Sequence, residues 1–386
     1  MKNRKKIAFI GTTGSSFYGF RADLIKQLVT ESHIVYALTS EYTDQCLEKI
    51  KELGAIPVPY YLSRGGLNPL ADIKSLLQLR KILFELQPEI VFSYFAKPVI
   101  YGTIAAKFAK VPLVIGMLEG LGYTFTEQPD GIANKTKLIK SIQVYLYKLA
   151  FPCLNKMIFL NSDDKRDLIE KYDLKVPEVH ILGGIGLHLE QYPYSIAPSN
   201  PVNFLFIGRL LKEKGIFELI EAIRIVKSKF PETIFTILGS IDHQNMGALK
   251  QTELDQLLTE SLFEYPGYVT NIEEWITKSS IFVLPSYREG VPRSTQEAMA
   301  IGRPVITTDV PGCRETVVDG VNGFLVPKWD SEALAEKMCY FIENPEMIKV
   351  MGLESYKIAQ QNFDVFKVNK KLFEIMGLEY TNETTC

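Results

Sequence analysis

Two glutamates eight positions apart, Glu289 and Glu297, flank the start of an expected helix in the second half of the chain. Glu289 lies in the loop after an apolar run, and Ser294 marks the helix start, with Glu297 three positions on as its partner in a capping box. The unpaired N–H groups of such a helix end attract a phosphate or a sugar hydroxyl. Two interpretations remain open at this point: a ligand site at a helix N-terminus, or a capping box in which Glu297 is structural.

The elements that position these residues alternate between apolar runs and helical patterns. Strand-like runs in the first half lie at 7–11, 33–39, 55–62, 89–94, 111–118 and 157–161. Helical patterns lie between them, for example from about 18 to 30 and over 71–86. Strands that alternate with helices form parallel βαβ units, and unbroken apolar runs suit strands covered on both faces. The pattern therefore predicts a doubly wound α/β fold.

A segment at 185–202 carries three prolines and no sustained periodicity, so we interpret it as a linker. The alternation then restarts, with strand-like runs at 203–208, 233–239, 265–269, 281–286, 304–309 and 323–326. We expect two Rossmann-like domains, 1–190 and 191–386. The final helices of the chain, about 355–377, can pack back on the first domain. Tandem domains of this kind face a central cleft, where the carboxyl ends of their strands bind ligands.

Composition excludes several classes of protein. The 386 residues carry a formal charge of −2, so no basic field over the whole chain argues for a nucleic-acid partner. The charge is nevertheless uneven, at +5 for residues 1–190 and −7 for the rest. No apolar run reaches the roughly 18 residues of a membrane-spanning helix. Five scattered cysteines without a C-x-x-C motif indicate a reducing cytosol, with no disulfide framework and no zinc site.

The segment E-G-x-P-x-x-x-x-E-A-M-A-x-G-x-P-V-I, at 289–306, resembles the E-x7-E signature of glycosyltransferase family 4, which has the GT-B fold. FIGRLLKEKG at 206–215, LGS at 238–240 and VVDGVNGFLVP at 317–327 match the family as well, as does the place of the linker. The resemblance covers essentially the whole chain. It implies a retaining glycosyltransferase that uses a nucleotide-activated sugar.

The resemblance implies a role for each matching residue of the second domain. Arg209 and Lys214 would hold the donor diphosphate, and two cations around one strand-to-helix turn suit a leaving pyrophosphate. Glu297 would accept hydrogen bonds from the ribose, and Glu289 would face the donor sugar. The donor-binding set implied in this way is Gly290, Val291, Pro292, Arg293, Ser294 and Glu297. The other interpretation of Arg209 and Lys214 is a pair of solvated cations at a helix start.

The first domain departs from the broad family. Many members place a histidine after one of its strands, but none of His33, His180, His188 and His243 occupies that position. Glu119 follows the fifth strand instead. Three interpretations of it remain open: a general base, a carboxylate that orients the acceptor, or a plain turn carboxylate. With Glu119, the expected catalytic set is Glu289, Arg209, Lys214 and Glu119.

Four segments of the first domain narrow the resemblance to one subgroup. They are GTTGSSFYGFR (11–21), LSRGGLNPL (62–70), FAKPVIYGTIAAK (95–107) and MLEGLGYTF (117–125). They are similar to O-antigen α-1,3-N-acetylgalactosaminyltransferases and related enzymes that act on undecaprenyl-diphosphate-linked amino sugars. Glycines in the loop 11–21 would allow close backbone approach to a ligand, and the arginines would meet the lipid diphosphate. The acceptor-binding set implied here is Gly14, Ser15, Arg21, Arg64 and Lys97.

The expected reaction moves an N-acetylhexosamine, with GalNAc in α-1,3 linkage as the best match, from a UDP-sugar to an undecaprenyl-diphosphate-linked sugar. The chain contains no D-x-D triplet, so we expect no metal and no other cofactor, with Arg209 and Lys214 in place of the cation. A GT-B nucleotide-sugar epimerase and a non-catalytic sugar-nucleotide-binding protein are the alternatives.

One segment bears on the membrane. Residues 131–151 carry Lys135, Lys137, Lys140 and Lys148 and no acidic residue. Ile139, Ile142, Leu146 and Leu149 recur there at helical spacing. A basic amphipathic helix lies in the interface of an anionic bilayer, and a helix packed on the sheet with solvated lysines gives the same pattern. We expect a cytoplasmic protein, peripheral on the inner face of the plasma membrane.

Overall fold

The computed structural model describes residues 4–40, 43–62, 68–242, 245 and 247–381. The chain divides into two compact units. The first, here called the N-unit, comprises Met1–Thr124, Ala133–Ile185 and Phe366–Cys386, and the second, the C-unit, comprises Phe125–Ile132 and Gly186–Val365. The linker therefore divides at Ile185/Gly186, where the sequence analysis places the boundary after residue 190, and the last helix of the chain, α14 (Val365–Met376), falls almost entirely in the N-unit.

The N-unit is built on a parallel sheet of seven strands in the order β3-β2-β1-β4-β5-β6-β7. The strands are β1 (Lys6–Ile10), β2 (Ile34–Thr39), β3 (Ile56–Pro59), β4 (Ile90–Tyr94), β5 (Leu113–Leu118), β6 (Lys156–Phe159) and β7 (Glu178–Ile181). The first six fall on the predicted apolar runs. The sequence analysis misses β7 because its residues, Glu-Val-His-Ile, alternate polar and apolar side chains and form no apolar run.

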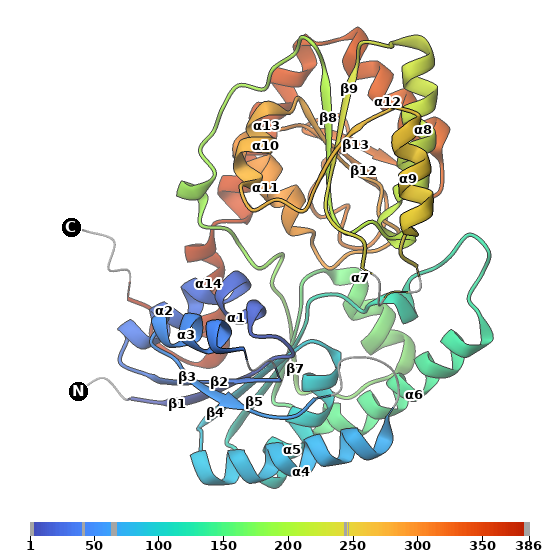
Figure 1. The fold of residues 1–386 in the computed structure, drawn as a ribbon. Coiled ribbons are helices and arrows are strands. Elements are labelled where there is room, and N and C mark those ends of the chain that lie inside the picture. The colour runs from blue at the N-terminus through green and yellow to red at the C-terminus, as the bar shows by residue number, and fades with distance from the viewer. Residues whose placement is uncertain (1–3, 41–42, 63–67, 243–244, 246, 382–386) are drawn as a thin grey trace. The chain divides into compact units, whose positions relative to one another are not determined.

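Helices cover both faces of this sheet. Figure 1 shows α4 (Pro69–Leu86), α5 (Thr103–Phe108) and α6 (Asn134–Ala150) on one face, and α1 (Ser15–Phe20), α2 (Ala22–Thr30), α3 (Asp44–Glu52) and α14 on the other. A π-helical turn, Pro98–Gly102, leads into α5, and a four-residue helix, α7 (Ser162–Lys165), follows β6. Two faces covered by helices explain why β4 is buried along its whole length.

The prediction for residues 11–30 needs a correction. The sequence pattern predicts a loop over 11–21 and one helix from about 18 to 30, but the structure has two helices that meet at Arg21. At Arg21 the backbone leaves the helical conformation, with φ −121° and ψ 3°, and its side chain is buried. An apolar periodicity gives no sign of such a break, because the residue that enters the core is a cation.

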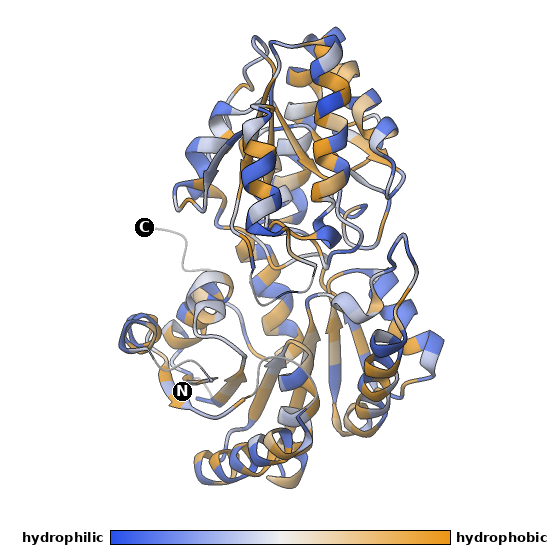
Figure 2. Ribbon diagram, turned by 45° about the vertical axis from the view of Figure 1, so that its right-hand side comes forward, coloured by the Kyte–Doolittle hydropathy of each residue, from blue (hydrophilic) through white to orange (hydrophobic). Residues whose placement is uncertain are grey.

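The C-unit has a parallel sheet of six strands in the order β10-β9-β8-β11-β12-β13. The strands are β8 (Asn203–Ile207), β9 (Ile234–Leu238), β10 (Glu264–Gly267), β11 (Ile281–Leu284), β12 (Val305–Thr308) and β13 (Gly323–Val326), and all six fall on predicted runs. The helices are α8 (Ile216–Lys229), α9 (Gln251–Thr259), α10 (Ile272–Lys278), α11 (Arg293–Ile301), α12 (Ser331–Glu343) and α13 (Glu346–Asn362). Figure 2 shows mainly hydrophobic residues along the strands and a mixture of hydrophobic and hydrophilic residues along the helices around them.

Each sheet is therefore the doubly wound α/β type that the alternation predicts, and in each the carboxyl ends of the strands gather at one edge. No helix within the described residues is long and apolar enough to cross a membrane.

Candidate active site

A tight contact between two loops organises the carboxyl edge of the C-unit sheet. Gly215, which ends the turn after β8, has φ +72°, and a Cβ atom there would lie 2.0 Å from the carbonyl oxygen of Pro285. The Tyr287 N–H also donates to the Glu213 carbonyl over 2.9 Å. The turn after β8 thus docks on the loop after β11, and only glycine fits the contact.

This docking brings Lys214 and Glu289 together. The Lys214 ammonium forms a short ion pair with Glu289 Oε1, and the Ser286 hydroxyl donates to the same oxygen over 2.7 Å. The two charged side chains are mostly buried, with exposed fractions of 21% and 13%. In such surroundings the pair is rigid and only weakly screened by solvent. Two of the residues that the resemblance assigns to the donor are therefore in direct contact.

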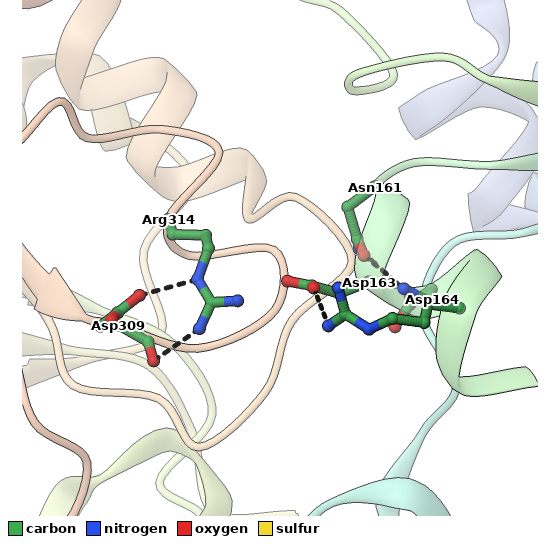
Figure 3. A network of polar contacts seen from close by, with 6 residues as sticks. Asn161, Asp163, Asp164, Asp309 and Arg314 are labelled. Atoms are coloured by element: carbon green, nitrogen blue, oxygen red, sulfur yellow. Dashed lines mark hydrogen bonds and ion pairs between the residues drawn. The ribbon is translucent and has the colours of Figure 1, made fainter. Parts of the chain in front are cut away.

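A third loop fixes the backbone of Glu289. The Glu289 N–H donates to the Pro311 carbonyl over 3.0 Å, and a Cβ atom on Gly312 would lie 2.3 Å from the Glu289 carbonyl oxygen. Arg314 holds this loop in turn, since its Nε donates to Asp309 Oδ1 over 2.7 Å (Figure 3). The Glu289 carboxylate is thus positioned by backbone contacts on both sides.

Arg209 pairs with a carboxylate other than Glu289. Its guanidinium donates to Asp242 over 2.7 Å, and its side chain is 57% exposed. The described contacts therefore bring Lys214, but not Arg209, to Glu289. Asp242 stands in the loop after β9, where nothing in the sequence pattern singled it out.

Glu297 is buried on the first turns of α11, and the capping-box interpretation is wrong. The helix begins at Arg293 with Pro292 as its N-cap, and no side chain caps it. Glu297 Oε1 instead accepts hydrogen bonds from the Tyr192 hydroxyl and from Arg293 Nε, both over 2.9 Å. Burial, followed by the Glu297 charge, raises the pKa of Tyr192 to about 12, so the phenol stays protonated and donates at neutral pH.

The rest of the predicted donor set surrounds the start of α11. Gly290, Val291 and Pro292 are buried, while Arg293 and Ser294 are half-buried. The Gln296 side chain donates to the Val291 carbonyl over 3.1 Å and so ties the loop to the helix. The N–H groups of the first helical turn have no side-chain cap, which leaves this end suited to an anion or a hydroxyl.

The N-unit places Arg21 against Glu119. The Arg21 guanidinium forms a short ion pair with Glu119 Oε1, and the exposed fractions are 2% for Arg21 and 12% for Glu119. The guanidinium carbon lies 5.3 Å from the ring centre of Tyr94, whose hydroxyl hydrogen-bonds Ser16 over 2.9 Å. Arg21 is therefore buried as the partner of Glu119. The predicted contact with a lipid diphosphate requires an exposed guanidinium, and the guanidinium of Arg21 is not exposed.

Lys97 lies at a second ion pair of the same unit. Its ammonium donates to Asp72 over 2.9 Å, and the Tyr101 hydroxyl donates to the other Asp72 oxygen over 3.0 Å. Burial, with the Asp72 charge second, raises the pKa of Tyr101. Lys97 is thus neutralised locally, and its ammonium is mostly buried.

The remaining acceptor predictions fall around α1. Gly14 is its buried N-cap residue, and Ser15 is exposed, with its hydroxyl 3.1 Å from that of Thr13. Gly11 makes room for Tyr94 rather than for a ligand, because a Cβ atom there would lie 2.4 Å from the Tyr94 hydroxyl oxygen. Arg64 lies outside the described residues.

A further loop of the N-unit is fixed after β6. Asn161 Oδ1 accepts from the Asp164 N–H over 2.7 Å and caps α7, as Figure 3 shows. Among the residues that the structure describes, no three His, Cys, Asp or Glu side chains gather as a ligand set for a metal ion.

The chain matches two family models. Residues 6–161 match the glycosyl transferase 4-like model, and residues 194–358 match that of the glycosyl transferases group 1. The chain is 28% identical over 355 residues to the N,N′-diacetylbacillosaminyl-diphospho-undecaprenol α-1,3-N-acetylgalactosaminyltransferase of Campylobacter jejuni, covering 89% of this chain and 90% of that enzyme. It is 25% identical to the UDP-Gal:α-D-GlcNAc-diphosphoundecaprenol α-1,3-galactosyltransferase of Escherichia coli, over 81% of this chain and 80% of that enzyme.

Solved structures share the fold. Anabaena Alr3699/HepE in complex with UDP and glucose aligns with a TM-score of 0.75 at 18% identity, over 97% of this chain and all of that one. Sucrose-phosphate synthase from Thermosynechococcus elongatus aligns with a TM-score of 0.77 at 16% identity, over 97% of this chain and 98% of that one. At these identities the likeness concerns the architecture.

Two glycines test the loop contact at the C-unit edge. Gly267→Ala should cost about 1–2 kcal/mol, because Gly267 has φ +80° but nothing within 4 Å of its Cβ position. Gly215→Ala adds a collision with the Pro285 carbonyl to the same backbone strain, so we expect a loss above about 3 kcal/mol. Urea unfolding of both variants measures the difference, and equal losses would contradict the contact.

The Arg21–Glu119 pair gives a second prediction. Arg21→Met should lower the free energy of unfolding by about 3–5 kcal/mol, because it leaves a largely buried carboxylate without its partner. The double variant Arg21→Met/Glu119→Gln should recover most of that loss in urea unfolding. A double variant as unstable as the single one would mean that packing of the arginine, and not its charge, is what matters.

Proposed function

Because the chain belongs to the GT-B glycosyltransferases, with a glycosyl transferase 4-like first half and a group 1 second half, we propose that it moves an N-acetylhexosamine from a UDP-sugar to an undecaprenyl-diphosphate-linked sugar. GalNAc in α-1,3 linkage is the specific proposal, in O-antigen or surface polysaccharide synthesis. The names of the two relatives support the acceptor class, since both are transferases acting on diphospho-undecaprenol-linked sugars with α-1,3 linkage. UDP bound to a protein of the same fold supports the donor.

The observation that carries the proposal is the Lys214–Glu289 contact beside the uncapped start of α11. Lys214 supplies a fixed positive charge for the donor diphosphate, and Glu289 supplies acceptor oxygens for sugar hydroxyls. Glu297, held by Tyr192 and Arg293, has a second carboxylate oxygen to offer to ribose hydroxyls. Arg209 reaches the diphosphate only after it exchanges Asp242 for phosphate oxygens.

The proposed chemistry retains the configuration of the donor. The bond between the sugar C1 and the β-phosphate oxygen breaks, and the acceptor hydroxyl attacks C1 from the face that the diphosphate leaves. The acceptor proton passes to the leaving diphosphate, so the products are UDP and the extended lipid-linked glycan. No covalent enzyme intermediate is required, and the task of Lys214 is to stabilise the charge that develops on the diphosphate.

On the acceptor side, we assign Glu119 to orienting the acceptor hydroxyl. Its pairing with Arg21 holds the carboxylate in one place, and the 12% exposed fraction leaves it reachable from the carboxyl edge of the N-unit sheet. A general base is unnecessary when the leaving diphosphate takes the proton. The expected contribution is therefore geometric, through a single well-placed acceptor of hydrogen bonds.

The purified protein, UDP-HexNAc and an undecaprenyl-diphosphate-linked sugar together test the function. Transfer to the lipid supports the proposal. Acceptor-free conversion of the donor to its epimer identifies the epimerase alternative, and donor binding without turnover identifies the non-catalytic one. A screen of UDP-GalNAc, UDP-GlcNAc and UDP-hexoses with the same acceptor then identifies the sugar.

The diphosphate assignment yields a paired prediction. Lys214→Ala should lower kcat at least about 10²-fold, because a preorganised charge at the leaving group supplies a few kcal/mol. Lys212→Ala is the matched control: Lys212 lies two residues away but pairs with Asp130 over 2.7 Å, so its kcat should stay near that of the wild type. Equal effects of the two variants in steady-state assays would argue against a specific role of Lys214.

Glu297 should act on donor affinity. Contacts to the ribose persist from the bound donor to the transition state, so Glu297→Ala should raise KM for the UDP-sugar more than it lowers kcat. Glu297→Gln, which keeps the shape of the side chain, separates loss of charge from loss of packing. A fall in kcat alone would contradict a ribose contact.

Metal independence is a further proposal. If Lys214 and Arg209 take the place of a divalent cation, excess EDTA should change activity by less than about twofold. Activity measured after removal of trace metals, with and without added Mn²⁺ or Mg²⁺, checks this. Loss of activity in chelator and its rescue by either ion would reassign the diphosphate charge to a metal.

A further inference from the structure

The outward side of α4 carries large apolar residues in contact with solvent. Leu70, Ile73, Leu77 and Phe84 are between 53% and 82% exposed. Their spacing of three, four and seven residues places them on one side of the helix. The opposite side is buried through residues such as Leu79 and Leu83, where the helix packs on α5 and the π-helical turn before it. The helix is therefore apolar on two sides, and only one of them is covered by the fold.

The two neighbouring helices continue this surface. Helix α4 packs beside α5, and α6 packs on the π-helical turn that leads into α5, on the same face of the sheet (Figure 1). Phe108 at the end of α5 is 62% exposed, and Leu138, Tyr145 and Leu149 on α6 are 49–62% exposed. We call this set the apolar ridge: Leu70, Ile73, Leu77, Phe84, Phe108, Leu138, Tyr145 and Leu149.

The expected stripe of α6 accordingly needs revision. The sequence analysis places Ile139, Ile142, Leu146 and Leu149 on the packed or membrane side. In the structure the buried residues are Val144, Tyr147 and Ala150, and the most exposed apolar ones are Leu138 and Tyr145. The packed side is thus rotated from the predicted stripe, so α6 both packs on the fold and presents apolar residues outward.

Positive charge surrounds the apolar ridge. Helices α4, α5 and α6 together carry eight Lys and Arg and only two acidic residues, Asp72 and Glu85. Asp72 is buried against Lys97, and the Glu85 carboxylate lies 3.9 Å from the Lys81 ammonium. The basic residues are Lys74, Arg80, Lys81, Lys107, Lys135, Lys137, Lys140 and Lys148. The surface therefore offers apolar groups and cations together, with almost no competing negative charge.

This combination selects one kind of partner. Apolar patches of this extent on a protein surface mark interaction sites, and those rimmed by cations suit anionic lipid, where alkyl groups enter the interface and ammonium groups meet phosphates. Each Lys or Arg at such a surface contributes about 1 kcal/mol to binding. A second copy of the same chain would instead bring two strongly positive faces together, which like-charge repulsion opposes.

We infer that the apolar ridge and its surrounding cations dock the N-unit on an anionic lipid bilayer. The inference deepens the proposed function and rests on it for its purpose, since a polyprenyl acceptor stays in the bilayer. Helix α6 follows β5, whose carboxyl end leads to Glu119, and the turn before α5 starts next to Lys97. Helices between parallel strands start at the carboxyl edge of the sheet, so a bilayer docked along these helices extends to the edge where Glu119 and Lys97 lie.

Flotation with vesicles of 70% phosphatidylcholine and 30% phosphatidylglycerol tests the inference. The ridge variant carries Leu70→Ser, Ile73→Ser, Leu77→Ser and Phe84→Ser, and its partition coefficient should fall at least about tenfold, because four apolar side chains no longer enter the interface. The control variant carries four substitutions at similarly exposed residues of the C-unit, Ile196→Ser, Tyr268→Ser, Val318→Ser and Val350→Ser, which are 52–75% exposed. It should float like the wild type.

Charge gives an independent measurement. Lys135→Glu/Lys137→Glu/Lys148→Glu should also lower partitioning at least about tenfold, and binding of the wild type should weaken as salt rises, because salt screens these exposed charges over about 8 Å. Vesicles of pure phosphatidylcholine should bind the wild type more weakly than the anionic ones. Circular dichroism of all variants confirms that they are folded.

Two results would overturn the inference. The first is equal flotation of the wild type and the ridge variant. The second is a wild-type dimer in sedimentation velocity that the ridge variant converts to monomer, without vesicle binding by either protein, which would assign the ridge to a second copy. An assay with a short-chain, water-soluble acceptor separates this question from the proposed function. Transfer to this acceptor by the ridge variant supports a docking role of the ridge. Vesicle binding by a wild type that transfers no sugar refutes the proposed function and leaves the docking inference intact.

Discussion

The candidate donor site depends on a backbone contact that only glycine permits. Because Gly215 places its α-carbon against the Pro285 carbonyl, the turn after β8 and the loop after β11 meet, and Lys214 reaches a carboxylate 75 residues further along the chain. Gly312 does the same for the loop after β12, against the backbone of Glu289. The ion pair is thus a consequence of how three strand ends pack, and side chains alone would not bring these charges together.

Pairing of buried charges is the second constraint, and it holds in both units. Lys214–Glu289 and Arg293–Glu297 in the C-unit and Arg21–Glu119 in the N-unit all combine a cation and a carboxylate that are mostly removed from water. Such pairing offsets the cost of removing each charge from solvent. A donor diphosphate would therefore bind to a lysine that is already paired. The Lys214 ammonium would have to contact Glu289 and the phosphate at the same time.

The sequence predicts the elements better than the contacts between them. Of the thirteen strands within the described residues, twelve lie on apolar runs, and the edge strand β7, in which polar and apolar residues alternate, does not. The chemistry-bearing segment around Glu289 was identified from its residue types and its resemblance. Tyr192, 105 residues from its partner Glu297, could not be, because a tyrosine in a proline-rich linker has no distinguishing pattern. The capping box failed for a related reason: spacing does not tell which residue is the N-cap.

Helices α4 and α6 show where pattern analysis stops. Apolar spacing identifies a helix with an apolar side, but it does not tell whether the sheet or the surroundings cover that side. In α6 the fold buries Val144, Tyr147 and Ala150, which leaves Leu138 and Tyr145 outward, and in α4 apolar residues lie on both the buried and the exposed side, so no single stripe stands out. Leaving such residues in water is unfavourable by about 25 cal/mol per Å² of apolar surface. A fold that nevertheless leaves them exposed beside eight cations has an outer face suited to lipid, and the acceptor of the proposed reaction resides in lipid.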